Sequence, residues 1–181
     1  MTEWLDIYDS HGRATGRVQP RDQVGGEDDY YLTVRIWVRE AGGRLLVTQR
    51  QSDRFWYPNC WECPGGFAQA GETGFVAARR ELAEETGLEP EEKAWRLLGD
   101  YIYEDIFSQH RYHAIVASYL VQLAEEMPDI RPQAEEVAGW LWVPGEDYPA
   151  FQEERPMEPF TPASFQLYSE QILTGFPKRK G

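Results

Sequence analysis

The chain has 181 residues, with 18 Lys and Arg against 31 Asp and Glu, so its net charge is −13. A fold of this length buries roughly 70% of the surface of its unfolded chain, so one domain over residues 1–181 is expected. The acidic balance disfavours binding to a nucleic acid polymer, and no apolar run is long enough to span a membrane. Two cysteines exclude a disulfide scaffold, and the first residues lack the features of a signal peptide, so a cytoplasmic location is expected.

Short runs in the N-terminal part of the chain predict strands. Residues 1–29 are expected to form one strand, at residues 4–8, followed by a polar loop rich in Gly and Asp. Residues 31–38 and 45–48 are dense in aromatic and β-branched residues, and two glycines lie between them. This arrangement predicts a hairpin.

The clearest predicted helix covers residues 73–86, where Ala, Glu, Arg and Leu dominate and no proline occurs. Gly87 follows it and provides a C-terminal stop. Further strands are predicted at residues 95–107, 112–123 and 139–143.

The C-terminal part ends in a second predicted helix, over residues 161–175. Thr161-Pro162 resembles an N-cap followed by proline in the first turn, and Gly175 resembles a stop. Residues 144–160 are acidic and rich in proline, and no helix or strand is predicted there. Strands around a central helix, with another helix after them, indicate a mixed α/β fold.

The chemistry of the chain is concentrated between Gly66 and Leu88, which read Gly-x5-Glu-x7-Arg-Glu-Leu-x-Glu-Glu-x-Gly-Leu. At about 100° per residue, three glutamates fall within one arc of the predicted helix and apolar residues lie mostly opposite. The glutamates are Glu81, Glu84 and Glu85, and the apolar residues are Phe75, Val76, Leu82 and Ala83. Like charges four residues apart repel, and a divalent cation with its preference for oxygen ligands would compensate that repulsion.

A solvated acidic helix face, with Arg80 paired to Glu84, is the simplest alternative for such a charge run. The full pattern argues against it, because nine constrained positions in one register arise by chance with odds on the order of one in a million. Upstream, Gly65 and Gly66 carry no side chain, so their backbone can approach a metal or a phosphate closely.

These residues match the signature of the Nudix hydrolase superfamily at every position, and by this resemblance the chain is identified as a member. The resemblance implies an α/β/α sandwich with a mixed sheet and a central catalytic helix. It implies hydrolysis of a diphosphate linkage in a nucleoside diphosphate-linked or similar small substrate. It also implies Mg²⁺ or Mn²⁺, held by Glu81, Glu84 and Glu85 and by a carbonyl of Gly65 or Gly66.

Two further residues take roles from the same resemblance. Arg80 would orient the glutamates through charge-assisted hydrogen bonds, and Glu72 would brace the loop and the helix by pairing with Arg80. The expected partner is a small diphosphate substrate. A homodimer is plausible, and the sequence does not establish it.

A carboxylate must accept the proton of the attacking water as the diphosphate is cleaved. In families of this type that base is a glutamate of the helix or an acidic residue of a later loop. Glu136, next to Glu135 and just before the strand predicted at 139–143, is the loop candidate. Glu104 and Asp105 are weaker candidates.

Two other functions stay open. The segments 3–9 and 57–61 resemble the Nudix branch related to isopentenyl diphosphate isomerases, which protonate a double bond with a cysteine followed closely by His-Pro. Cys63 is followed by Pro64 with no histidine nearby, so an isomerase is the second choice. The third is a non-catalytic nucleotide-binding sensor of the same fold, in which loss of a helix glutamate is expected, and none is missing.

Aromatic and basic residues outside the signature could also serve the substrate. Trp56 and Tyr57 are among the rings that could stack on a nucleobase, although aromatic residues on strands mostly belong to the core. Arg50 and Arg54 could contact phosphate or ribose, or could simply be solvated. Zinc is a minor alternative, because residues three apart on a strand point to opposite faces and would scatter the ligands. The four residues in question are Cys60, Cys63, His110 and His113.

Overall fold

The computed structural model describes residues 2–176, and most of its strands come in consecutive runs, before and after helix α1. In chain order they are β1 (Trp4–Tyr8), β2 (Ala14–Pro20), the short 3₁₀ helix η1 (Arg21–Gln23), β3 (Tyr31–Arg39), β4 (Arg44–Arg50), β5 (Trp61–Glu62), β6 (Gly65–Phe67), α1 (Gly74–Thr86), the 3₁₀ helix η2 (Glu92–Ala94), β7 (Trp95–Phe107), β8 (His110–Gln122), β9 (Val137–Pro144), α2 (Tyr148–Glu154) and α3 (Phe160–Thr174).

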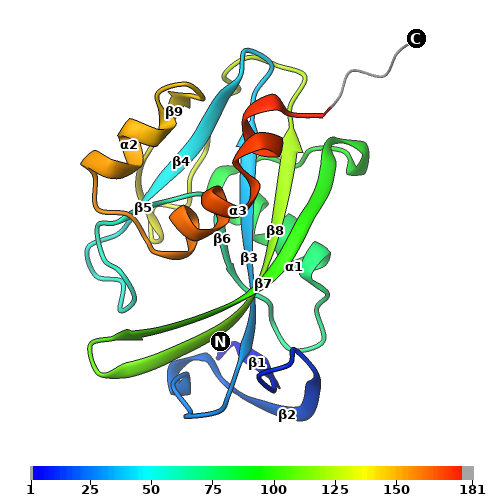
Figure 1. The fold of residues 1–181 in the computed structure, drawn as a ribbon, viewed down its shortest axis with the longest axis vertical. Helices are drawn as coiled ribbons and strands as arrows, with labels where there is room; N and C mark the ends of the chain where they lie inside the picture. The colour runs from blue at the N-terminus through cyan, green and yellow to red at the C-terminus, as the bar shows by residue number, and fades with distance from the viewer. Residues whose placement is uncertain (1, 177–181) are drawn as a thin grey trace.

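The main sheet is mixed, with the strand order β5-β4-β3-β8-β7, while β6 pairs with β3 and β9 pairs with β4. Strands β3 and β8 run parallel, with Tyr31 opposite Ala114 and Arg39 opposite Gln122, and the other pairs are antiparallel. A parallel pair needs a long crossover connection, and the chain between β3 and β8 contains α1. Strands β1 and β2 form a separate two-stranded sheet at one end of the domain (Figure 1). The prediction of one strand and a loop over residues 1–29 is therefore wrong, because residues 14–20 pair with β1 as a second strand.

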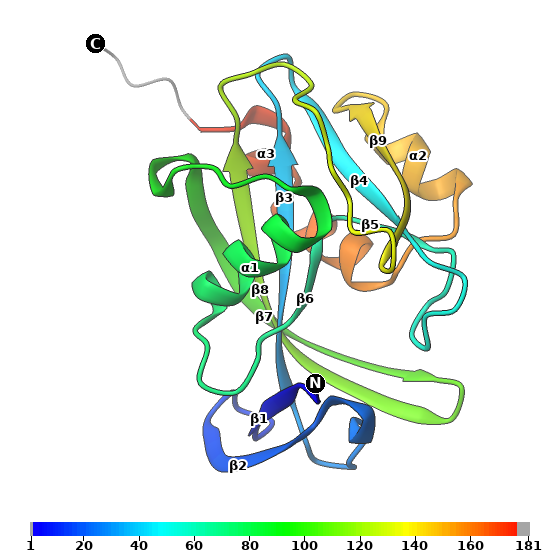
Figure 2. The same ribbon diagram turned by 180° about the vertical axis from the view of Figure 1, so that it is seen from behind.

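Helices cover both faces of the main sheet. Helix α3 crosses one face, and α1 lies on the opposite face (Figures 1 and 2). Alternate residues of β3 therefore enter two different cores, with Val34 and Ile36 in the cluster that holds Leu82 of α1, and Trp37 in the cluster that holds Phe165 of α3. This arrangement confirms the predicted α/β/α sandwich with a mixed sheet.

Helix α1 begins and ends where the sequence predicts. The Thr73 hydroxyl accepts a hydrogen bond from the Val76 backbone N–H at 3.3 Å, and Gly87 caps the other end in the left-handed conformation, with φ +72°. The predicted packing face is wrong in one respect, because Val76 is 52% exposed. The buried face instead carries Ala77 and Ala78, whose small side chains let the helix approach the sheet closely.

The C-terminal part differs from the prediction in two places. Helix α2 lies within the segment for which no element was predicted, and α3 begins at Phe160 with Pro159 at its N-cap position. The predicted N-cap role of Thr161 is wrong, because the Glu158 carboxylate accepts hydrogen bonds from the backbone N–H groups of Phe160 and Thr161, at 3.1 and 3.2 Å. None of the helices in residues 2–176 has the length and hydropathy needed to cross a membrane.

Candidate functional site

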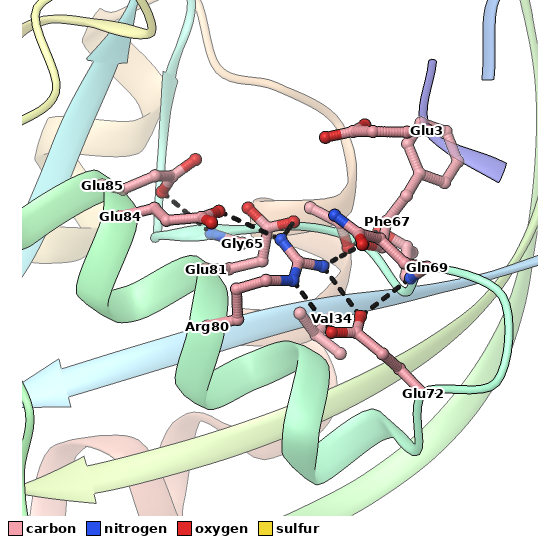
Figure 3. Close-up of polar contacts among 12 residues, drawn as sticks. Glu3, Val34, Gly65, Phe67, Gln69, Glu72, Arg80, Glu81, Glu84 and Glu85 are labelled. Carbon is pink, nitrogen blue, oxygen red and sulfur yellow. Dashed lines mark hydrogen bonds and ion pairs between the residues drawn. The ribbon is translucent and has the colours of Figure 1, made fainter. Parts of the chain in front are cut away.

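Arg80 is the centre of a hydrogen-bond network on α1 (Figure 3). Its Nε and Nη2 atoms each donate to Glu72 at 2.9 Å, and Nη2 also donates to the carbonyl of Phe67 at 3.0 Å. Its Nη1 atom donates to Glu81 at 2.8 Å and to Glu84 at 3.0 Å. These contacts use all five N–H groups of the guanidinium, so Arg80 fixes the helix to the loop before it. The predicted pairing of Glu72 with Arg80 is confirmed.

The three glutamates of α1 have different surroundings. Glu81 and Glu85 are 6% and 4% exposed and lie on the buried face, whereas half of the Glu84 side chain is exposed. The prediction that all three lie opposite the packing residues is wrong for Glu81 and Glu85, which share a face with Leu82. Helical geometry explains this, since positions 81, 82 and 85 lie within about 100° of arc.

Burial controls the protonation of the two inner glutamates. Burial raises the pKa of Glu81 to about 7, although Arg80 favours the charged form. Burial also raises the pKa of Glu85 well above its ordinary value, and repulsion by Glu62 and Glu81 adds to this effect. The backbone N–H of Gly65 donates to Glu85 at 3.1 Å, which offsets only part of the cost.

The glycines of β6 are required by the closeness of these carboxylates. A Cβ atom on Gly66 would lie 2.6 Å from both carboxylate oxygens of Glu81. A Cβ atom on Gly65 would lie 2.1 Å from the carbonyl oxygen of Val34 on the neighbouring strand. The glycine backbone therefore forms one wall of the site directly opposite the carboxylates.

Two further ion pairs surround the inner end of the site, and the sequence analysis missed them. Arg35 lies 3.0 Å from Glu158, and both side chains are at most 5% exposed. Arg50 lies 2.7 Å from Glu62, which is also buried. Each arginine thus neutralises one carboxylate. Glu85 has no ion pair within the described residues, so no partner offsets the cost of ionising this buried carboxyl group directly. The partners are up to 123 positions apart, and no local pattern marks such pairs.

A narrow cavity of about 40 Å³ lies against Glu81, Glu85 and the two glycines, and a larger pocket of about 730 Å³ lies outside it. Arg21, Arg50, Arg54, Trp56 and Glu136 line both.

Glu136 therefore borders the same cavity as the helix carboxylates, with Arg54 3.4 Å away. Glu135 lines only the outer pocket. The weaker base candidates, Glu104 and Asp105, accept hydrogen bonds from Tyr30 and Tyr57 and are not among the residues that line either space.

The residues present fit a divalent cation that prefers oxygen ligands. Two buried carboxyl groups, one of them without an ion pair in the described chain, face a backbone that a Cβ atom would obstruct. Mg²⁺ is usually held by one or two carboxylates plus substrate phosphates. Within residues 2–176, no three side chains of Asp, Glu, His or Cys gather closely enough to hold a metal by themselves, and Glu84 turns toward Arg80. The ligand set of Glu81, Glu84, Glu85 and a carbonyl of Gly65 or Gly66 stays a prediction.

Comparison with known proteins agrees with this geometry. The sequence profile of the NUDIX domain matches residues 29–164, which is most of the chain. The chain belongs to the Nudix family. The predicted membership is confirmed, and with it the assignment to the Nudix hydrolases at the level of the family.

Three relatives show how the match extends along the chain. Nudix hydrolase 3 of Arabidopsis thaliana is 29% identical over 82% of this chain, which spans only 20% of that relative. An uncharacterized Nudix hydrolase of Listeria monocytogenes is 27% identical, covering 88% of this chain and 90% of its own. An isopentenyl-diphosphate Delta-isomerase of Cutibacterium acnes is 30% identical, and the match covers 80% of this chain and 75% of that enzyme.

Solved structures share the fold at low sequence identity. DR0079 from Deinococcus radiodurans superposes with a TM-score of 0.71 and 20% identity, over 92% of this chain and 99% of its own. The second is a bifunctional NMN adenylyltransferase/ADP ribose pyrophosphatase from Francisella tularensis, complexed with AMP and a Mn ion. It superposes with a TM-score of 0.62 and 20% identity, over 79% of this chain and 42% of its own.

Proposed function

We propose that this Nudix-family chain hydrolyses a diphosphate linkage in a small nucleotide-like substrate, with Mg²⁺ or Mn²⁺ held at Glu81, Glu85 and the carbonyl of Gly65 or Gly66. One observation carries the proposal: two buried carboxylates, one of them without an ion pair in the described chain, face the glycine backbone at the inner end of a pocket. A buried carboxylate left uncompensated is costly, and a bound cation would remove that cost.

The chemistry assigns a task to each residue of the site. A bound divalent cation would neutralise the diphosphate oxygens and lower the pKa of a water molecule. Arg80 holds Glu81 and Glu84 in place, so its role is one of positioning. Glu136 borders the cavity and would accept the proton of the attacking water.

The arginines at the mouth of the cavity suit the same substrate. Arg21 and Arg54 line both the inner cavity and the outer pocket. Within the described residues each donates to one carboxylate, that of Glu3 and that of Glu136 respectively, so its other N–H groups are left to meet an anionic ligand. This local charge matters because the whole chain carries −13 and repels anions at long range.

The test is a panel of dinucleoside polyphosphates, sugar nucleotides, nucleoside triphosphates and isopentenyl diphosphate, incubated with Mg²⁺ and then with EDTA. We expect phosphate or nucleotide release from at least one compound with Mg²⁺, none with EDTA, and a loss of at least 100-fold in Glu85→Gln. Turnover of Glu85→Gln within a few-fold of the wild type would overturn the assignment. Nucleotide binding without turnover would favour the non-catalytic sensor.

Isomerisation of isopentenyl diphosphate is the second candidate, and the relative from Cutibacterium acnes favours it. The environment of Cys63 argues against it, because this thiol is fully buried and does not line the cavity. Burial raises the pKa of Cys63 to about 12, and the backbone and thiol contact the Thr161 hydroxyl. Conversion of the prenyl chain without release of phosphate would favour the isomerase over the hydrolase.

A further inference from the structure

Arg35 is a buried arginine that lines the narrow cavity and has no part in the proposed function. The register of the sheet places it on β3 opposite Gly65, whose backbone N–H donates to Glu85 (Figure 3). A Cβ atom on Gly65 would lie 2.9 Å from Nη1 of Arg35. The guanidinium of Arg35 therefore lies directly against the glycine wall of the candidate metal site.

The hydrogen-bonding capacity of Arg35 is only partly used. Its Nη1 atom donates to the carbonyl of Val34 at 2.8 Å, and its Nη2 atom lies 3.0 Å from the Glu158 carboxylate. Its Nε atom is buried and has no hydrogen-bond partner in the part of the chain that the structure describes. A buried N–H donor without an acceptor is costly, and an anion in the cavity would supply the acceptor.

Glu158 also lines this cavity, but its carboxylate is occupied within the protein. Its two oxygens contact Nη2 of Arg35, the backbone N–H groups of Phe160 and Thr161, and the Thr161 hydroxyl. A carboxylate accepts about four hydrogen bonds, so Glu158 has little capacity left for a ligand. The free polar groups that this ion pair offers to the cavity are thus the N–H donors of Arg35.

The cavity is small and is closed on its inner side. Thr33, Tyr112 and Phe160 line it without lining the outer pocket, and all three are buried. A volume of about 40 Å³ holds roughly three groups of the size of a water molecule, at about 10–15 Å³ each. A terminal phosphoryl group with its three free oxygens matches this size, whereas a ribose or a nucleobase exceeds it.

We propose that Arg35 binds the terminal phosphate of a substrate whose diphosphate ends in a free phosphoryl group, and thereby selects such substrates over diphosphates esterified at both ends. The proposal rests on the proposed function for the position of the diphosphate beside Glu81 and Glu85. A group attached to the inner phosphate would need space that the buried lining of the cavity fills. Nucleoside diphosphates and triphosphates belong to the selected class, and sugar nucleotides and dinucleoside polyphosphates do not.

Binding of compounds that resist hydrolysis tests this proposal apart from turnover. The probes are α,β-methylene-ADP and its terminal methyl ester, titrated calorimetrically with Mg²⁺ and again in EDTA. The methylene bridge prevents cleavage, and the two compounds differ only at the terminal phosphate. We expect the wild type with Mg²⁺ to bind the free phosphate at least ten-fold more tightly than the ester.

Variants of the ion pair assign this preference to Arg35. Arg35→Gln combined with Glu158→Gln leaves no buried charge unpaired and should reduce the preference to less than two-fold. Glu158→Gln alone keeps the arginine and should keep the preference. Arg35→Lys, which keeps the charge beside Glu158, serves if the double variant does not fold, and should lower the preference at least three-fold. Arg39→Gln is the matched control, because Arg39 lies on the same strand outside the cavity.

A preference that survives in the folded double variant, or unchanged in Arg35→Lys, would overturn the proposal, because Arg35 would then only neutralise Glu158. Loss of the preference in Glu158→Gln alone would overturn it too, since the selection would then belong to the start of α3. Equal binding of both compounds that depends on Mg²⁺ would overturn this inference and leave the proposed function standing. Binding of neither compound would overturn both. A preference that depends on Arg35, in a protein that hydrolyses nothing, would contradict the proposed function alone.

Discussion

Neutralising Glu85 should stabilise the metal-free protein at alkaline pH. Glu85 is 4% exposed, has no ion pair within the described residues, and lies near the negative charges of Glu62 and Glu81. Glutamine has nearly the same shape and can still accept the hydrogen bond from Gly65. The substitution Glu85→Gln therefore removes an unfavourable buried charge and keeps the packing.

The size of the effect can be judged from Glu81, whose pKa rises from an ordinary 4.5 to about 7. The folded state then holds its proton longer than the unfolded state, so stability is highest below pH 4.5 and falls as the pH rises through 7. At about 1.4 kcal/mol for each pKa unit, Glu81 lowers the free energy of unfolding by about 3 kcal/mol over this interval. The raised pKa of Glu85 acts in the same direction.

Urea unfolding in EDTA at pH 5 and pH 8 measures this directly. We expect the free energy of unfolding of the wild type to be lower at pH 8 than at pH 5 by at least about 2.5 kcal/mol, the share of Glu81 alone. Glu85→Gln should be more stable than the wild type at pH 8 only. Glu84→Gln is the matched control on the same helix. Because half of the Glu84 side chain is exposed, this change should alter stability by no more than about 0.5 kcal/mol.

Magnesium should restore the stability that the wild type loses at alkaline pH. At a concentration of 100 times its Kd, a bound ion adds about 2.7 kcal/mol to the free energy of unfolding, and Glu85→Gln should gain much less. The reasoning is refuted if wild-type stability in EDTA is constant or rises between pH 5 and pH 8. The reasoning is also refuted if Glu85→Gln is less stable than the wild type at both pH 5 and pH 8, since the carboxylate would then have a stabilising partner in the folded protein.

Three further predictions concern the neighbouring residues. Arg80→Lys should lower kcat roughly 10- to 100-fold in a protein with an unchanged circular dichroism spectrum, because a lysine cannot replace five directed N–H donors; unchanged kinetics would contradict the positioning role. Gly66→Ala should weaken Mn²⁺ binding at least ten-fold in a calorimetric titration, because the added Cβ atom would lie 2.6 Å from the Glu81 carboxylate. Gly139→Ala is the control and should leave Mn²⁺ binding unchanged, because the nearest atom to its Cβ would be 4.0 Å away. Glu136→Gln should lower kcat on the order of 100-fold with little change in KM, whereas Glu135→Gln should leave kcat within a few-fold of the wild-type value. An equal loss of kcat in the two variants would exclude a base at position 136.

Features with a local signal could be predicted from the sequence. Helix α1 was bounded correctly because Thr73 and Gly87 act through neighbouring backbone groups. The hairpin of β3 and β4 was predicted from hydrophobic patterning and the mixed sheet from the Nudix signature, whereas the parallel pairing of β3 with β8 was not predicted. Helix α2 also carries a local signal, the proline in its first turn, which the acidic composition around it obscured.

Features that depend on contacts distant in sequence could not be predicted. Arg35 and Glu158 are joined only when α3 packs on the sheet, so neither residue stands out in its own segment. The burial of Glu81 and Glu85 depends equally on β6, which approaches α1 through glycines that a linear pattern does not orient. The cytoplasmic location and the homodimer stay predictions.

The most direct test of the account is the anomalous diffraction of crystals grown with Mn²⁺. We expect a peak within bonding distance of a carboxylate oxygen of Glu81 or Glu85 and close to the backbone of Gly65 and Gly66, and no peak there in Glu85→Gln crystals. Mn²⁺ bound elsewhere while this cavity holds only water, in a protein that still cleaves its diphosphate substrate, would contradict it.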